Sequence, residues 1–447
     1  MTENKKLNRR FFMKGAGATA LIGSAISGSA ALPSMASAKG MGAMGMSMTY
    51  DLNEEFNRIG SGDSKWDMIR KSARPHKVPF PMGVADMDFR TFPRITEALT
   101  SRMGHENWGY HPIPDDFYDN IIAWNKKRYN QDIKRKNILN ALGVLDGVLS
   151  ILLSHNTGEN PVLVQTPGYS GFFGIIKTAQ FTALENPLKL EDGRWTMDLD
   201  TMAKQIDENG VKVMLFCNPQ NPTGNCWTAD EMRAMGDLCL SKGVLVVADE
   251  IHCDFVNKHT KYVPYATLGE KYAQNSYTLK STSKSFNLAA HHVAYLFSDN
   301  DDYIEGLKKR GHQRGSLNAL GMIACNAAYK YGAGYMDDMR DYIDGNCKFL
   351  EKFCAEEMKD VKYKVHEGTY LAFIDCSKVA KKLGKSEDGK RTGDMLKQFF
   401  IEKAGVNLNP GENYGANGVG YMRMNLATTH LKLHKALNAM KAAVDAI

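Results

Sequence analysis

The chain has 447 residues, of which 43% are hydrophobic and 24% charged. This length and composition are typical of soluble domains with sizeable cores, which excludes the disordered and collagen-like classes. The formal net charge is +6, but residues 1–38 hold five Lys or Arg and one Glu, which accounts for +4 and leaves +2 for the rest. We therefore expect no nucleic-acid partner.

Residues 1–38 have the layout of a twin-arginine export signal. A basic start contains the pair Arg9 and Arg10, a weakly apolar Gly/Ala stretch follows, and the segment ends in the small-residue motif Ala-Ser-Ala. The alternative, an uncleaved membrane anchor, is disfavoured by the many Gly and Ser residues. We expect export by the twin-arginine machinery, cleavage after Ala38 and a periplasmic protein. Residues 39–50 then form a flexible Gly/Met spacer.

The cysteines form no CxxC pattern, and several lie inside apolar runs such as VMLFCN and LAFIDC. Disulfides would suit an oxidising compartment, yet buried free thiols fit these surroundings better. The methionines of the spacer offer soft metal ligands, but a flexible tether explains them more simply. We therefore predict no metal site. The cysteines are Cys217, Cys226, Cys239, Cys253, Cys325, Cys347, Cys354 and Cys376.

From residue 91 onward, helix-like stretches alternate with apolar strand-like runs. Such runs between helices are typical of a mostly parallel sheet covered on both faces, in which ligands bind at the carboxyl ends of the strands. One helix starts at a Thr cap and ends at Gly243. We predict helices at 94–103, 115–129 and 228–243, and strands at 161–166, 211–217, 243–250, 275–281 and 293–298.

The last part of the chain has a different pattern. Amphipathic helices over 334–358 lead to strand-like runs that contain LAFID and YMRMN, which indicates a smaller α+β domain. We therefore predict an α/β protein with a large domain at 91–334. The small domain is expected to combine residues 335–447 with the segment 51–90.

Polar residues follow three of the predicted strands. The turn CNPQNPTG brings Asn221 after one strand, the next strand ends in Asp249, and Lys284 follows the strand after that. Because neighbouring strand ends meet at one edge of a parallel sheet, these side chains are expected to form a site. A buried carboxylate at such a place needs a cation nearby.

An aldehyde cofactor on a heteroaromatic ring uses these three groups together. A lysine amine forms an imine with the aldehyde, an aspartate keeps the ring nitrogen protonated, and an asparagine donates to the ring oxygen. The set therefore predicts pyridoxal 5′-phosphate (PLP). The alternatives are an ordinary loop cation at Lys284 and a purely structural turn at Asn221.

The cofactor phosphate and ring need further partners. Gly143 and Gly147 open an apolar helix whose first backbone N–H groups can hold a dianion, and Ser281 adds a hydroxyl donor. Tyr169 follows the 161–166 strand, where its ring can either stack on the cofactor or simply pack.

With these motifs in place, the chain resembles the fold-type I PLP enzymes of the class I/II aminotransferase family, and more narrowly their MalY/PatB-type cystathionine β-lyase, or carbon–sulfur lyase, subgroup. The resemblance runs in order through nearly all of the chain after residue 50. The matching motifs are SKWD (64–67), GVADMDF (83–89), WGYHP (108–112), TPGYSGF (166–172), CNPQNPTGNCW (217–227), DEIHCDF (249–255), STSKSFN (281–287), EGTYLAFID (367–375) and NPGENYGANGVGYMRMNLA (409–427).

The resemblance implies a large PLP-transferase type domain and assigns roles to single residues. Arg423 would bind the substrate α-carboxylate through two parallel N–H groups. Tyr110 would reach into the site of a neighbouring subunit, which implies a homodimer with shared active sites. The implied cofactor contacts are Lys284 with the aldehyde, Asp249 with the ring nitrogen, Asn221 and His252 with the ring oxygen, Tyr169 with the ring face, and Val144, Leu145 and Ser281 with the phosphate.

Two histidine positions depart from the aminotransferase pattern. His252 occupies the place of a tyrosine in many aminotransferases, and the run DEIH resembles the lyase subgroup. An arginine that often grips the phosphate is absent, and His292 stands there beside His291. His292 either replaces that phosphate contact or packs.

The resemblance implies an enzyme with a small amino-acid substrate. We expect a carbon–sulfur β-lyase that cleaves cystathionine or related S-substituted cysteines to a thiol, pyruvate and ammonia. Lys284 would take the Cα proton, and Tyr110 or Lys284 would protonate the leaving thiolate. The alternatives are an aminotransferase with the same residues and a non-catalytic regulatory protein with a PLP fold.

Overall fold

The computed structural model describes residues 49–155, 158–311, 317–384 and 389–447. The predicted export signal, its cleavage site and all but the end of the predicted spacer lie outside these residues. Within the described ranges, no helix is long and apolar enough to cross a bilayer, and no cluster of His, Cys, Asp or Glu could hold a metal ion. All eight cysteines are buried free thiols, as predicted.

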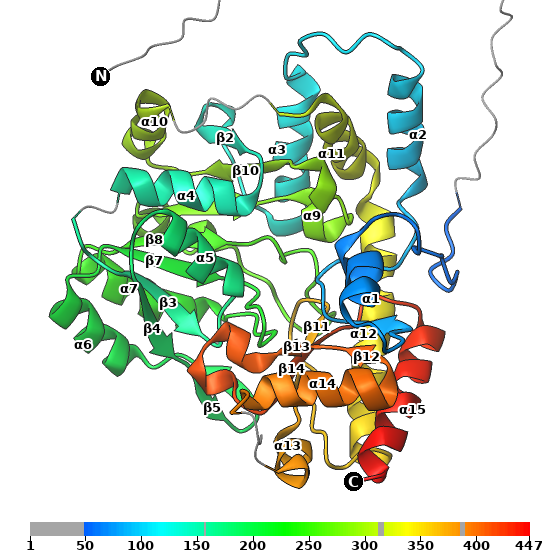
Figure 1. Ribbon diagram of the computed structural model, residues 1–447. Helices are drawn as coiled ribbons and strands as arrows, with labels where there is room; N and C mark the ends of the chain where they lie inside the picture. Colours follow the sequence, from blue (N-terminus) through cyan, green and yellow to red (C-terminus); the bar gives the residue numbers. More distant parts are fainter. Residues whose placement is uncertain (1–48, 156–157, 312–316, 385–388) are drawn as a thin grey trace, which may run out of the picture. The chain divides into compact units, whose positions relative to one another are not determined.

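A mostly parallel sheet lies at the centre of the described chain (Figure 1). Its strands pair in parallel except at β10, which runs antiparallel to both β9 and β2. In spatial order, the described strands are β2 (Ile138–Ala141), β10 (Ala294–Phe297), β9 (Ser276–Lys280), β8 (Leu245–Asp249), β7 (Val213–Cys217), β3 (Val162–Thr166) and β4 (Ala183–Pro187). The predicted fold class is confirmed, although the sequence prediction lacks β2 and β4.

Both faces of this sheet are apolar. Its central strands are nearly continuous apolar runs, and successive side chains point to opposite faces. In β7, Val213 and Leu215 belong to one core cluster, whereas Met214 and Phe216 belong to another. The first cluster includes residues of α4 (Val144–His155), α5 (Ser170–Thr178) and α10 (Asp301–Arg310). The second includes residues of α6 (Leu199–Asn209) and α7 (Ala229–Ser241). Helices therefore cover both faces, as the run of apolar strands predicts.

The predicted helices form close to their expected bounds. The helix α7 begins after Thr228, whose side chain forms a capping box with Glu231, and Gly243 follows its end with a φ of 64°. The other described α-helices are α1 (Ile69–Ser72), α2 (Pro93–Met103), α3 (Asp115–Tyr129), α8 (Glu270–Gln274), α9 (Thr282–Ser285), α11 (Ala319–Tyr331), α12 (Ala333–Glu356), α13 (Ser377–Leu383), α14 (Thr392–Ala404) and α15 (His430–Asp445).

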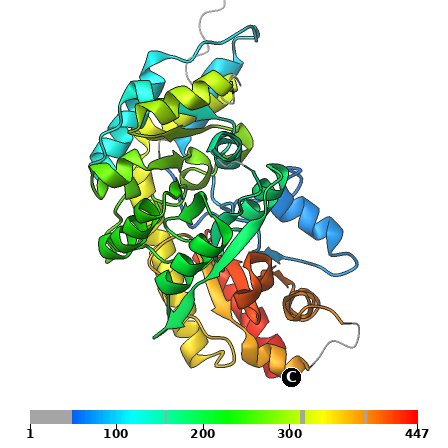
Figure 2. The ribbon, with the colours of Figure 1, turned by 90° about the vertical axis from the view of Figure 1, so that its left-hand side faces the viewer.

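The C-terminal part builds a smaller antiparallel sheet from β11 (Leu371–Asp375), β14 (Tyr421–Asn425) and β13 (Asn409–Pro410). The N-terminal segment joins it, because β1 (Phe80–Pro81) pairs in parallel with β12 (Val406–Asn407). In Figures 1 and 2 these C-terminal elements, in orange and red, gather at one end of the central sheet. A short hairpin of β5 (Lys189–Glu191) and β6 (Arg194–Thr196) completes the strands. The predicted domain boundaries stay predictions.

Candidate active site

Lys284 lies on α9, the helical turn that follows β9, and its side chain is half-buried. Its Nζ atom donates to the backbone carbonyl of Ala85 at 2.8 Å. Burial and the positive charge of Arg423 lower the pKa of Lys284 to about 8, although Asp86 and Asp249 act in the opposite direction. About a tenth of this amine is therefore unprotonated at pH 7, far more than for an ordinary lysine, as a nucleophile or base requires.

Asp249 is the last residue of β8 and is only 3% exposed. Its Oδ1 atom accepts from the backbone N–H of Ile251 at 3.1 Å, and among the described residues it forms no ion pair. Burial raises the pKa of this carboxyl group to about 7. The adjacent Glu250 differs, because the buried Lys280 lies 3.3 Å from it. Asp249 is thus a buried carboxyl group that forms no direct ion pair within the described residues, although the charge of Lys284 acts on it.

Arg423 in β14 and Asn221 in the turn after β7 are both buried and bond to each other. Nη1 of Arg423 donates to Oδ1 of Asn221 at 3.0 Å, and Nη2 donates to the carbonyl of Gly83 at 3.0 Å. The Nε atom of Arg423 is buried without a hydrogen-bond partner among the described residues. The side-chain oxygen of Asn221 therefore accepts from Arg423, and the NH₂ group of Asn221 is left to donate to another acceptor.

Tyr169 precedes α5 directly after β3, and its side chain is partly exposed. Burial and the charge of Asp249 raise the pKa of Tyr169, while Arg423 lowers it. Because these charges act on the hydroxyl, Tyr169, Asp249 and Arg423 share one electrostatic environment. The structure thus brings Tyr169 to the edge of the sheet where the sequence places it.

His252 is buried, and its Nδ1 atom has no hydrogen-bond partner in the described part of the chain. Its ring meets that of Tyr370 edge to face, with centroids 5.8 Å apart. Burial, together with the charges of Lys284 and Arg423, lowers the pKa of His252 well below its usual value. The imidazole is therefore neutral and keeps a nitrogen available for a ligand.

The predicted phosphate contacts are less uniform. Val144 and Leu145 begin α4, as the apolar run after Gly143 predicts. The Ser281 hydroxyl, however, donates to the carbonyl of Val293 at 2.6 Å and accepts from the N–H of Ser283 at 3.0 Å. A phosphate would have to compete for that hydroxyl hydrogen, so the role of Ser281 stays a prediction.

His292 and Tyr110 lie on exposed parts of the structure. His292 adopts the left-handed conformation with a φ of 52°. Its side chain is exposed, which argues against a role in packing. Burial and the charge of His292 lower the pKa of the half-buried His291. Tyr110 lies in the loop between α2 and α3 with a fully exposed side chain. Its predicted role in a neighbouring subunit stays a prediction.

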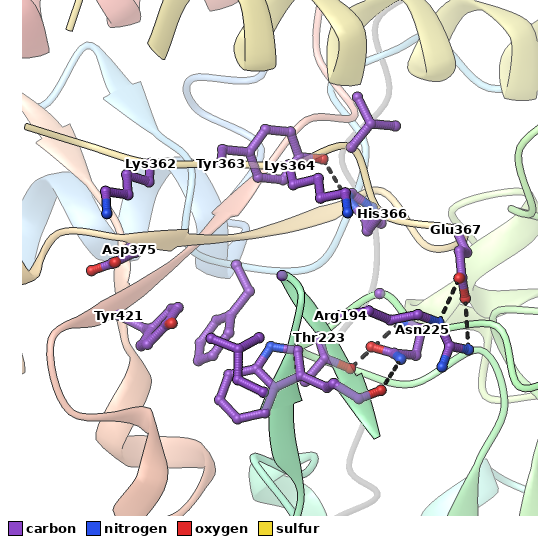
Figure 3. A pocket seen from close by; sticks show the side chains of 16 residues that line it. Arg194, Thr223, Asn225, Lys362, Tyr363, Lys364, His366, Glu367, Asp375 and Tyr421 are labelled. Carbon is purple, nitrogen blue, oxygen red and sulfur yellow. Dashed lines mark hydrogen bonds and ion pairs between the residues drawn. The ribbon is translucent and has the colours of Figure 1, made fainter. Parts of the chain in front are cut away.

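A separate pocket of about 400 Å³ lies beside the turn that carries Asn221 (Figure 3). Several of its polar groups pair with one another: Arg194 donates to Glu367, and Asn225 donates to the carbonyl of Trp195. None of the predicted site residues lines it. Its lining residues are Leu190, Gly193, Arg194, Trp195, Thr223, Gly224, Asn225, Lys362, Tyr363, Lys364, Val365, His366, Glu367, Phe373, Asp375 and Tyr421.

The sequence prediction assigns no role to the segment 83–88, which lies against the site. Its backbone carbonyls accept from Lys284 and Arg423. The motif GVADMDF marks the segment in the sequence, but a backbone carbonyl leaves no residue-type signal. The only available signal is therefore the motif itself.

Comparison with known proteins identifies the family. Residues 77–440 match the model of the family described as aminotransferase class I and II. The chain belongs to this family. Cystathionine β-lyase PatB of Bacillus subtilis is 32% identical over 404 residues, which cover 89% of this chain and the whole of that protein. Protein MalY of Escherichia coli is 29% identical over 404 residues, which again cover 89% of this chain and the whole of that protein. The crystal structure of cystalysin from Treponema denticola, which contains PLP, has a TM-score of 0.83 and 28% identity, and covers 89% of this chain and all of that one.

Members of this family depend on PLP, and the described residues fit that cofactor. The amine of Lys284 has a pKa of about 8, within reach of imine formation near neutral pH. Asp249 is a buried carboxylate without an ion pair in the described chain, which suits a protonated pyridine nitrogen. The free nitrogen of His252 and the NH₂ group of Asn221 supply further polar contacts. The chain is therefore a PLP-dependent enzyme.

Proposed function

We propose that this enzyme is a carbon–sulfur β-lyase that cleaves cystathionine or related S-substituted cysteines to a thiol, pyruvate and ammonia. The observation that carries the proposal is the half-buried amine of Lys284, whose pKa of about 8 reflects burial and the nearby Arg423. An amine and a guanidinium so placed suit a base for the Cα proton and an anchor for the adjacent carboxylate. Relatives named cystathionine β-lyase support this choice within the family.

The side chains divide the work of the proposed reaction. Arg423 binds the substrate α-carboxylate, and the unprotonated Lys284 amine takes the proton from Cα. When bound, PLP would accept the electron pair of that C–H bond into its ring. The Cβ–S bond then breaks, the sulfur leaves with the bonding electrons, and Lys284 or Tyr110 returns a proton to the thiolate. Water releases pyruvate and ammonia.

Release of pyruvate from cystathionine without any keto-acid acceptor tests the lyase directly. The purified PLP-loaded protein should form pyruvate and thiol in equal amounts, and Lys284→Ala should abolish both. Full activity in the Lys284→Ala variant would contradict the proposed mechanism.

An aminotransferase is the second candidate, because the family model that matches is that of aminotransferases. It would use Lys284 and Arg423 in the same places but would transfer the amino group to an acceptor. Turnover that appears only after addition of a keto acid would favour this activity and contradict the lyase.

We further propose a homodimer in which Tyr110 enters the partner's site. The exposed loop that carries Trp108 and Tyr110 supports this, because two large aromatic side chains are open to solvent there. Mixing the variants Lys284→Ala and Tyr110→Ala gives hybrid dimers with one intact site, so activity should return to about a quarter of wild type after subunit exchange. No recovery in exchanged dimers would contradict a shared site.

We also propose that the protein is exported to the periplasm after it has folded. The support is the layout of residues 1–38, which include Arg9 and Arg10. In fractionated cells, Arg9→Lys combined with Arg10→Lys should leave the protein in the cytoplasm. Equal periplasmic amounts of variant and wild type would contradict this route.

A further inference from the structure

The segment 83–88 contacts Lys284 and Arg423, the two residues on which the proposed function depends most. The carbonyl of Ala85 accepts from Nζ of Lys284 at 2.8 Å, and that of Gly83 accepts from Nη2 of Arg423 at 3.0 Å. One stretch of backbone therefore sets the positions of the amine and the guanidinium together. A shift of this segment would move both groups.

Side chains from two other parts of the chain clamp the segment. Nδ2 of Asn425 in β14 donates to the carbonyls of Val84, at 2.6 Å, and Asp86, at 2.5 Å. On the other side, Oδ1 of Asn287 accepts from the N–H of Met87 at 2.9 Å, and its Nδ2 donates to the carbonyl of Met87 at 3.1 Å. Asn287 lies just after α9, so the clamp connects the segment with the helical turn that bears Lys284.

A buried ionic cluster fixes the end of the segment. Lys65 is 1% exposed, and its Nζ atom donates to the carbonyl of Asp86 at 2.9 Å and lies 3.0 Å from Oδ1 of Asp88. The same Asp88 oxygen accepts from Nε1 of Trp66 at 2.8 Å. Nζ of Lys432 in α15 lies 3.6 Å from the other Asp88 oxygen. Although burial alone would raise it, Lys65 and Lys432 lower the pKa of Asp88 to about 2, so Asp88 is charged at neutral pH.

A second cation reinforces this attachment. Nη1 of Arg58 lies 2.7 Å from Oδ1 of Asp86 and donates to the carbonyl of Met87 at 2.8 Å. Buried ion pairs are costly because both charges lose their hydration. Apolar packing would hold the segment 83–88 at a lower cost in free energy. A cluster that binds both carboxylates and backbone carbonyls is therefore better explained by the fixed position that it gives the segment than by stability alone.

We infer that Asp88, Lys65 and Asn287 are positioning residues of the active site. They fix the backbone of 83–88, and the carbonyls of Gly83 and Ala85 in turn hold Arg423 and Lys284. The inference rests on the proposed roles of Lys284 and Arg423. Neither Asp88 nor Lys65 touches the reacting atoms.

The variant Asp88→Asn tests this, with Asp344→Asn as the matched control. Asp344 is also a buried carboxylate paired with a lysine, since Lys348 lies 2.7 Å away, but among the described residues no hydrogen bond or ion pair joins it to the segment. In PLP-loaded Asp88→Asn we expect the KM for cystathionine to rise about tenfold or more, because misplaced binding groups are costly. The pH at which the visible absorbance of the bound PLP changes should also move. The Asp344→Asn protein should keep its KM within about twofold and its absorbance titration unchanged.

A milder variant covers the case in which Asp88→Asn does not fold. Asn287 has a φ of 58°, a conformation that glycine adopts without strain, so Asn287→Gly removes both bonds to Met87 and leaves the backbone relaxed. It should shift KM and the absorbance titration in the same direction. If the folded Asp88→Asn or Asn287→Gly proteins match Asp344→Asn in both measurements, the positioning role is wrong. If wild type releases no pyruvate, the proposed function is wrong, and the absorbance titration alone then decides the positioning role.

Discussion

Nη1 of Arg423 donates a 3.0 Å hydrogen bond to Oδ1 of Asn221, and this bond joins the small C-terminal sheet to the turn after β7. The two residues are far apart in the sequence but act on one site. The bond also fixes which side of the Asn221 amide is free, because the oxygen accepts from Arg423. A residue proposed to bind the substrate thus orients one proposed to bind the cofactor.

Replacing Arg423 by lysine should weaken substrate binding much more than it slows the chemical step. Lysine keeps the charge but cannot hold a carboxylate through two parallel N–H groups. We expect KM for cystathionine to rise by roughly 10- to 100-fold, which corresponds to about 1.5–3 kcal/mol for a charge-assisted hydrogen bond. Steady-state kinetics would measure this, with the exposed Arg391→Lys as control. An unchanged KM would remove Arg423 from the carboxylate site.

The rate at which the apo-protein takes up PLP should rise with pH with a midpoint at about pH 8 and level off about one pH unit higher. The amine of Lys284 reacts only when unprotonated, and its pKa is about 8. Because the charge of Arg423 helps to lower that pKa, Arg423→Gln should move the midpoint to higher pH. Rapid-mixing absorbance measurements between pH 6 and 10 would show both midpoints. A pH-independent rate would contradict this account of Lys284.

Asp249→Asn should stabilise the apo-protein while it destroys activity. Burial raises the pKa of Asp249 to about 7, so the folded state prefers the protonated carboxyl, and its stability falls as pH rises from about 4 to 7. The ionised carboxylate then costs on the order of 4 kcal/mol above pH 7, and asparagine removes that cost. Urea unfolding should show a larger gain at pH 8 than at pH 5. Equal gains at the two pH values would contradict the raised pKa.

Lys280→Met should destabilise the protein by about 3–5 kcal/mol, because it leaves the buried Glu250 without its cation. Adding Glu250→Gln should restore much of this loss, since the uncompensated charge is then gone. Chemical denaturation of the single and double variants measures the difference. A double variant as unstable as Lys280→Met would show that the lost hydrogen bonds from Lys280 to Asn125 and Gln131, rather than the charge of Glu250, dominate.

The sequence predicts the central sheet well because its strands are apolar on both faces and are separated by helices. It does not predict the direction of β10, since an apolar run such as VAYLFS reads the same in either orientation. Asp249 and Lys284 are found because polar residues at the ends of buried strands stand out. The role of Arg423 comes only with the family resemblance, and the hydrogen bond of Ser281 to Val293 depends on a backbone atom that sequence does not mark.

The pairing of β1 with β12 has a consequence for how the chain matures. Phe80 pairs with Val406, so a segment that is synthesised early must wait for one that is synthesised near the end before it can dock. Contacts between such distant parts of a chain form late, because the long loop between them must close first. The carbonyls beside Lys284 and Arg423 follow directly after β1. A nascent or truncated chain therefore has its reactive lysine before the backbone that positions it has docked, and activity requires the completed polypeptide.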